Sequence, residues 1–141
     1  MIGHKILKHK KRIVNLKLDI TRLVGLIENG VDTGFTLIAE HQAISSILAD
    51  ATTQLLACRK RVDDMRNDAS TSIIAMAVAE EESADAAYRQ ALKNEKASRD
   101  ILKEHNSQLM IIVNDRKRLT SEYHNLVQSA GNILAGSISH Y

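Results

Sequence analysis

Proline and tryptophan are absent from this chain of 141 residues, and aromatic residues make up only 3% of it. Globular cores usually contain several large rings, so this composition argues against an ordinary globular core. Glycine and proline break helices most strongly, by about 1 and about 3 kcal/mol relative to alanine. None of the six glycines lies between residues 35 and 130. This stretch is rich in good helix formers, and we predict that it forms long helices.

The residue patterns that carry common active-site chemistry are also missing. A single cysteine, Cys58, excludes an intrachain disulfide and the usual thiolate zinc sites. No glutamate is followed by a histidine three residues later, and no two histidines are four residues apart, as helical metal sites require. A glycine-rich phosphate loop is absent too. We therefore expect no catalytic residue, metal, cofactor or small-molecule substrate, and a protein that is not an enzyme.

Signals for export or membrane insertion are not found either. The first residues lack the apolar core of a signal peptide, and no run reaches 18 apolar residues. We expect a protein of the cytoplasm or of the interior of an assembled particle, without a signal peptide or a transmembrane helix.

Isoleucines recur every seven residues from Ile6 to Ile27, and leucines follow three residues after two of them. This is a heptad pattern with β-branched residues at one seam position and leucine at the other. It predicts a first helix over about residues 4–29. Gly30 resembles a glycine that ends a helix in the left-handed conformation, so residues 30–34 are predicted to be a loop. The heptad frame continues beyond this loop. Spacing alone can produce such a continuation by chance, so we do not interpret it as one continuous helix.

Farther along the chain, mostly small residues occupy the predicted seam, and the seam then changes register. The predicted core positions in this stretch, most of them small, are Ala69, Ser72, Met76, Ala79, Ser83 and Ala86. A register shift is predicted between about residues 87 and 102, where a new apolar frame begins. We expect the last helix to fray near Gly131, which leaves a tail over residues 131–141.

Residues 67–72 are polar or small and favour turns, because their side chains compete for backbone hydrogen bonds. A hairpin centred there places residues 59–61, which are basic, opposite residues 80–82, which are acidic. It also brings residues 109–135 alongside residues 6–32, with the first helix either extended beside the last or folded back into a three-helix bundle. The alternative is one continuous helix. The predicted fold is all-α, an elongated helical hairpin or coiled-coil bundle that forms a single domain over residues 1–141.

Positive charge is concentrated at the start of the chain. Residues 1–18 hold six basic residues and no acidic one, whereas the remainder has a net charge of −4. This basic N-terminal arm could contact nucleic acid, an anionic membrane or an acidic protein surface. The candidate contacts are Lys5, Lys8, Lys10, Lys11, Arg12 and Lys17.

The patterns favour a non-enzymatic structural protein that acts by helical self-association or by packing in a larger complex. Examples of this class are a machine or virion subunit, a scaffold, and an export stalk or chaperone. The expected partners are further copies of the chain or other subunits of a complex. The predicted self-association seam consists of Ile6, Ile13, Leu16, Ile20, Leu23, Ile27, Leu109, Ile112, Leu119, Leu126 and Ile133. The alternative function is an adaptor whose basic arm binds an anionic partner.

Overall fold

The computed structural model describes residues 2–67 and 70–139, and the side chains of residues 3–67 and 70–136. Two helices account for almost all of them, α1 (Ile2–Met65) and α2 (Thr71–Ser139). No strand occurs among the described residues. The helices pack against each other as a hairpin, which confirms the predicted all-α fold.

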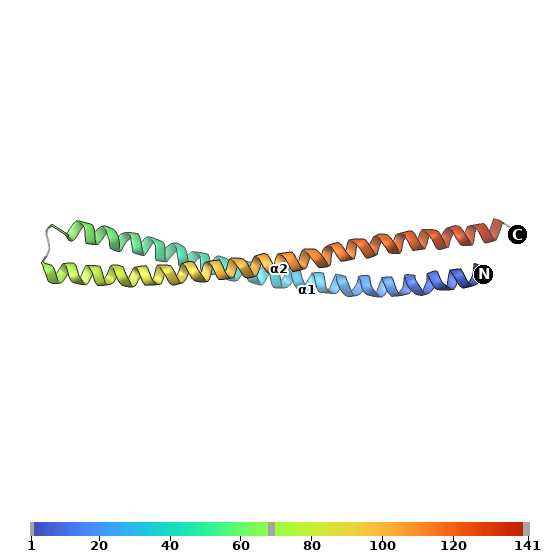
Figure 1. Cartoon of the computed structure of the whole chain (residues 1–141), viewed down its shortest axis with the longest axis horizontal. Coiled ribbons are helices and arrows are strands. Elements are labelled where there is room, and N and C mark those ends of the chain that lie inside the picture. The colour runs from blue at the N-terminus through green and yellow to red at the C-terminus, as the bar shows by residue number, and fades with distance from the viewer. Residues whose placement is uncertain (1, 68–69, 140–141) are drawn as a thin grey trace. The chain divides into compact units, whose positions relative to one another are not determined.

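The chain divides into two units. Unit 1 comprises Met1–Thr33 and His105–Tyr141, and unit 2 comprises Gly34–Glu104. Within unit 1, the first part of α1 lies beside the last part of α2 (Figure 1). Within unit 2, the other parts of the two helices lie side by side and are joined by the turn (Figure 1).

The turn between the helices lies where the sequence predicts it. α1 ends at Met65, and α2 begins at Thr71. The backbone carbonyl of Ser70 accepts a hydrogen bond of 3.0 Å from the Ile74 N–H. Ser70 therefore stands at the N-cap position, which serine favours. Ala69, one of the predicted core residues, lies outside the described residues.

The predicted pairing of the helices is confirmed in both units. In unit 2, Arg61 Nη1 lies 2.7 Å from Glu80 Oε2, and Arg59 Nε lies 3.9 Å from Glu81 Oε1. In unit 1, Arg12 Nη2 lies 2.7 Å from Glu122 Oε1. Residues near the start of α1 thus meet residues near the end of α2. The three-helix alternative is wrong, because α1 is one helix.

The predicted loop at residues 30–34, which ends the first helix near residue 29, is wrong. α1 runs through these residues, and no described glycine has a positive φ. A Cβ on Gly30 would lie 2.7 Å from Leu109 Cδ1, so glycine here permits a close approach of α2 within unit 1. Glycine inside a helix costs about 1 kcal/mol relative to alanine, and packing along the seam offsets this cost. The seven-residue frame that starts at Ile6 is buried or half-buried through to Met65.

The predicted register shift in α2 is also wrong. One frame of alternating three- and four-residue steps is buried or half-buried from Ile74 to Ile133, with Arg116 as its single exposed position. Of the core residues that the sequence predicts in this stretch, Ser72, Met76, Ala79, Ser83 and Ala86 are all exposed. Their alanine neighbours Ala77 and Ala91 are buried instead, at 2% and 5% exposure. Because alanine occurs on several faces of this stretch, its spacing does not identify the packed one.

α2 continues through Gly131 to Ser139 instead of fraying near Gly131. Gly131 and Gly136 each lower helix propensity by about 1 kcal/mol, but no proline follows to stop the helix. The half-buried Ala130 and Ile133 keep this part of α2 in the seam. The last two residues of the predicted tail, 140 and 141, lie outside the described residues. Over the described part of the chain, neither helix has an apolar stretch long enough to cross a membrane.

Candidate functional site

The predicted self-association seam lies in unit 1, on the sides of α1 and α2 that face each other. Leu16 and Leu23 are buried, with 0% and 6% of their surface exposed. The remaining seam residues are half-buried: Ile6, Ile13, Ile20, Ile27, Leu109, Ile112, Leu119, Leu126 and Ile133. Packing within the chain therefore engages these side chains, and a partner would contact the residues that flank them.

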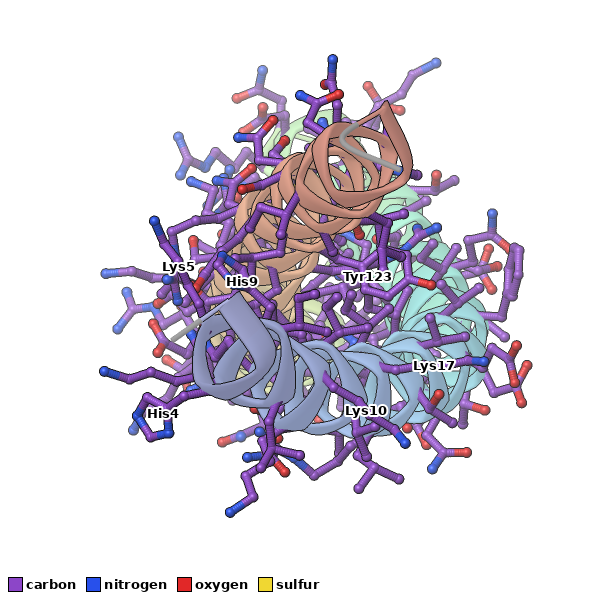
Figure 2. All side chains as sticks on the ribbon, turned by 90° about the vertical axis from the view of Figure 1, so that its right-hand side faces the viewer. His4, Lys5, His9, Lys10, Lys17 and Tyr123 are labelled. Carbon is purple, nitrogen blue, oxygen red and sulfur yellow. The ribbon has the colours of Figure 1, made fainter. Side chains whose placement is uncertain are left out.

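The predicted basic arm forms the first turns of α1. Lys5, Lys8, Lys10, Lys11 and Lys17 are all exposed. Figure 2 shows Lys10 and Lys17 on the outside of α1, whereas Tyr123 of α2 lies between the two helices. The sixth basic residue is engaged within unit 1: Arg12 donates hydrogen bonds of 3.0 Å from Nε and 2.7 Å from Nη2 to Glu122 Oε1.

Apolar side chains lie among these lysines. Leu7, Val14 and Leu18 are 50%, 49% and 64% exposed. Their spacing of seven and four residues places them on one side of the helix. We call the surface formed by Leu7, Lys10, Lys11, Val14, Lys17 and Leu18 the basic outer face.

Unit 2 contains a groove of about 490 Å³ between its two helices. Small side chains form much of its lining, and two carboxylates, Asp50 and Glu80, also border it. The small residues are Ala51, Cys58, Ser83, Ala84 and Ala87. Small side chains fill less of the space between two helices than leucine or isoleucine would, which accounts for the hollow.

A second groove of about 280 Å³ lies on the same side of unit 2. Glu40 and Ile101 line it, whereas Ile47 and Ala87 line the first groove. Glu40 and Ile47 are seven residues apart on α1, and Ala87 and Ile101 are fourteen apart on α2, so each pair shares one side of its helix. We call this side of unit 2, which holds both grooves, the groove face.

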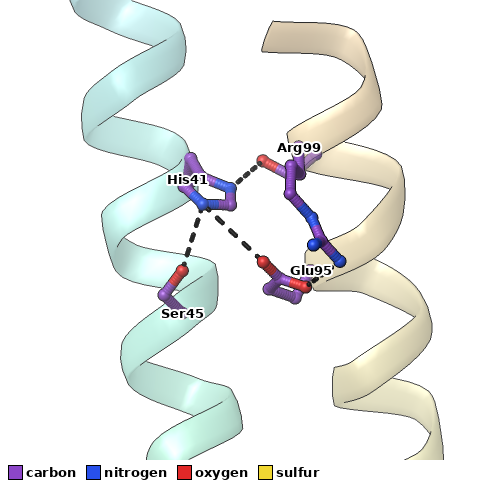
Figure 3. A network of polar contacts seen from close by, with 5 residues as sticks. His41, Ser45, Glu95 and Arg99 are labelled. Carbon is purple, nitrogen blue, oxygen red and sulfur yellow. Dashed lines mark hydrogen bonds and ion pairs between the residues drawn. The ribbon is translucent and has the colours of Figure 1, made fainter. Parts of the chain in front are cut away.

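Unit 2 also holds a polar network that the sequence analysis did not identify (Figure 3). His41 Nδ1 lies 3.2 Å from Ser98 Oγ, and His41 Nε2 lies 3.4 Å from Ser45 Oγ and 3.8 Å from Glu95 Oε1. Glu95 also accepts a hydrogen bond of 3.1 Å from Arg99. A signal was present in the sequence, because His41 occupies the frame that starts at Ile6.

Serine, histidine and a carboxylate are the residue types of a catalytic triad. Ser98, however, lies in the middle of α2, where backbone N–H groups donate to carbonyls of the same helix. Those groups are not available to stabilise an oxyanion. Polar residues at seam positions commonly fix the register of paired helices, and we interpret the His41 network in this way.

A second histidine contact lies in unit 1. His105 Nε2 is 2.7 Å from the backbone carbonyl oxygen of Gly30. Gly30 is also the position where α2 approaches α1 closely through Leu109. The polar contact and the missing side chain therefore occur at the same point of the seam.

The two units carry opposite net charges. Unit 1 has ten basic and five acidic residues, a net charge of +5, and unit 2 has nine basic and twelve acidic residues, a net charge of −3. The basic outer face belongs to the positive unit, and the groove face belongs to the negative one.

Among the described residues, no three His, Cys, Asp or Glu side chains cluster closely enough to hold a metal ion. No protein-family model, curated protein or solved structure matches the chain.

Proposed function

We propose that this protein is a non-enzymatic assembly subunit whose helices pack against helices of another subunit. The apolar surface beside the seam carries this proposal. Within the described residues, six apolar side chains are buried, whereas seventeen large ones are at least 40% exposed. Full burial of one such side chain is worth about 1.5–3 kcal/mol, so covering only part of this surface would drive association.

The exposed apolar residues include pairs at helical spacing. Leu7 and Val14 on α1 are seven residues apart, as are Val127 and Leu134 on α2. Residues at this spacing lie on one face, and such stripes are what helix-in-groove recognition uses. A pair of helices has one shared seam, so each helix keeps apolar faces that stay available to a further helix.

Light scattering on the full chain tests this proposal. The expected result is a mass that exceeds the 15.6 kDa of one chain, rises with concentration and persists at high salt. Salt weakens contacts between exposed charges but not the burial of apolar surface. A mass of one chain at every concentration would overturn the assembly function.

A second candidate function is an adaptor that binds nucleic acid or an anionic membrane. The five exposed lysines of the first turns of α1 favour it. Contacts with phosphates release counterions, so such binding weakens steeply as salt rises. The test is binding of duplex DNA, duplex RNA and phosphatidylserine vesicles at low salt, with Lys8→Glu/Lys11→Glu as the variant. Lys93→Glu/Lys96→Glu, at exposed positions of α2, is the matched control. Absence of binding by the wild type would overturn this candidate.

A further inference from the structure

We propose that the groove face of unit 2 binds the basic outer face of a second copy of the chain. This inference rests on the assembly function proposed above. It adds the identity of the partner and the two surfaces that meet.

The two surfaces match in shape. The larger groove is lined by small side chains, including Ala84 and Ala87, and its volume is about 490 Å³. The basic outer face presents Leu7, Val14 and Leu18 on one side of α1, each about half exposed or more. Recognition of a helix by a groove uses apolar residues at such spacing, which insert between the two helices that form the groove.

The two surfaces also match in charge. Asp50 borders the larger groove, and Glu40 borders the smaller one. On the basic outer face, Lys10 and Lys11 line a shallow depression together with Leu7 and Val14. The charged side chains that line the two grooves are all carboxylates, of which Glu80 is paired with Arg61, and those of the basic outer face are all lysines. The two surfaces therefore carry opposite signs. Complementary charges favour the correct partner and orientation more than they add affinity.

The charges also explain why unlike surfaces meet. A symmetric contact through the basic outer face would set Lys10 and Lys11 of two chains against each other. A symmetric contact through the groove face would set Glu40 and Asp50 of two chains against each other. Like charges in contact oppose association, so the pairing of unlike surfaces is favoured. Such a contact leaves one surface of each kind unused at the ends, and therefore permits growth beyond a dimer.

Two variants each block one of the surfaces. Ala87→Leu places a larger side chain in the groove at an exposed position, where it displaces no seam packing. Lys10→Glu/Lys11→Glu reverses the charge of the basic outer face. Each is expected to weaken association at least about tenfold in dissociation constant. Ala86→Leu, at the exposed neighbouring position that does not line the groove, and Lys93→Glu/Lys96→Glu are the matched controls.

Mixing the two blocked variants gives the decisive measurement. The Ala87→Leu chain keeps an intact basic outer face, and the Lys10→Glu/Lys11→Glu chain keeps an intact groove. At a concentration above the dissociation constant of the wild type and below those of the variants, the mixture should therefore form a particle of two chains that does not grow. Each variant alone should be mainly monomeric at that concentration. Circular dichroism melting of each variant verifies that its helices remain folded.

The outcomes separate this inference from the assembly function. A monomeric wild type overturns both. A wild-type oligomer that either blocked variant leaves intact, or a mixture that stays monomeric, overturns this inference alone. A wild type that stays monomeric but binds DNA or vesicles, with that binding lost in Lys8→Glu/Lys11→Glu, overturns it in favour of the adaptor.

Discussion

The two units use the same pair of helices, but α2 fills their seams differently. In unit 1, the half-buried seam residues of α2 include Leu109, Ile112 and Leu119. In unit 2, six of the nine positions of the same frame from Ile74 to Leu102 hold small or polar residues: Ala77, Glu81, Ala84, Ala91, Glu95 and Ser98. Large aliphatic side chains bury more apolar area per residue, so each seam residue of α2 contributes more on average in unit 1 than in unit 2. The small residues of unit 2 leave grooves between the helices, and its polar residues form contacts across the seam.

The largest expected effect is on the seam of unit 1. Leu16 is completely buried, so Leu16→Asp places a carboxylate in an apolar seam without a partner. We expect a loss of at least about 3 kcal/mol in the free energy of unfolding, measured by urea titration with circular dichroism. The control is Leu56→Asp, at a side chain that is 58% exposed. Equal losses for the two variants would show that the seam does not dominate stability.

A smaller effect is expected at the close approach in unit 1. In Gly30→Leu, the new Cβ atom would lie only 2.7 Å from Leu109 Cδ1, which is too close for two carbon atoms. Overpacking of this kind costs about 1–3 kcal/mol, against which the replacement of a helical glycine returns up to about 1 kcal/mol. Gly25→Leu is the matched control, since a Cβ there meets nothing within 4 Å. This control should gain up to about 1 kcal/mol from helix propensity. Thermal melting should therefore give a lower midpoint for Gly30→Leu than for Gly25→Leu, and an equal or higher midpoint would contradict the close approach.

The next prediction concerns the frame of α2 in unit 2. Ala77 is 2% exposed, whereas Ala79 is exposed. Alanine to glycine lowers helix propensity by about 1 kcal/mol at either position. Ala77→Gly also removes a buried methyl group, worth about 0.8 kcal/mol more. Urea titration should therefore rank Ala77→Gly as the more destabilising variant, and the reverse order would restore the frame through Met76 and Ala79.

The smallest effect is expected for the ion pairs. Arg61 and Glu80 have side chains that are 54% and 49% exposed. Arg61→Ala should therefore lower the free energy of unfolding by less than about 1 kcal/mol, and by still less at high salt. Arg12→Ala serves as its counterpart in unit 1, where the side chains of Arg12 and Glu122 are 48% and 37% exposed. A loss above about 2 kcal/mol for either variant would mean that these pairs do more than align the helices.

The features that the sequence predicts correctly depend on strong and local signals. The absence of proline predicts the helices, and the polar residues around Ser70 predict the turn. Once the turn is placed, chain geometry alone sets residues 59–61 opposite residues 80–82. These inferences need no knowledge of which side chains touch.

The features that the sequence misses depend on packing across the seam. Gly30 has the local preference of a helix end, but its contact with Leu109 decides its role. The frame through Ala77 depends on which alanines face α1, which alanine spacing does not reveal. The groove face has the same origin, because a hollow between two helices is defined only once both are placed.

The unbroken frame of α1 limits how the length of this chain can change. An insertion of one residue inside a helix rotates everything beyond it by about 100° and turns the apolar side outward. An insertion of seven residues leaves the apolar side of the helix pointing in nearly the same direction. It needs an equal insertion at the matching place in the other helix, so that the two seams stay aligned. Viable length variants should therefore differ by whole heptads that occur in pairs. Single-residue changes should be tolerated at the turn, where neither helix has to keep its phase.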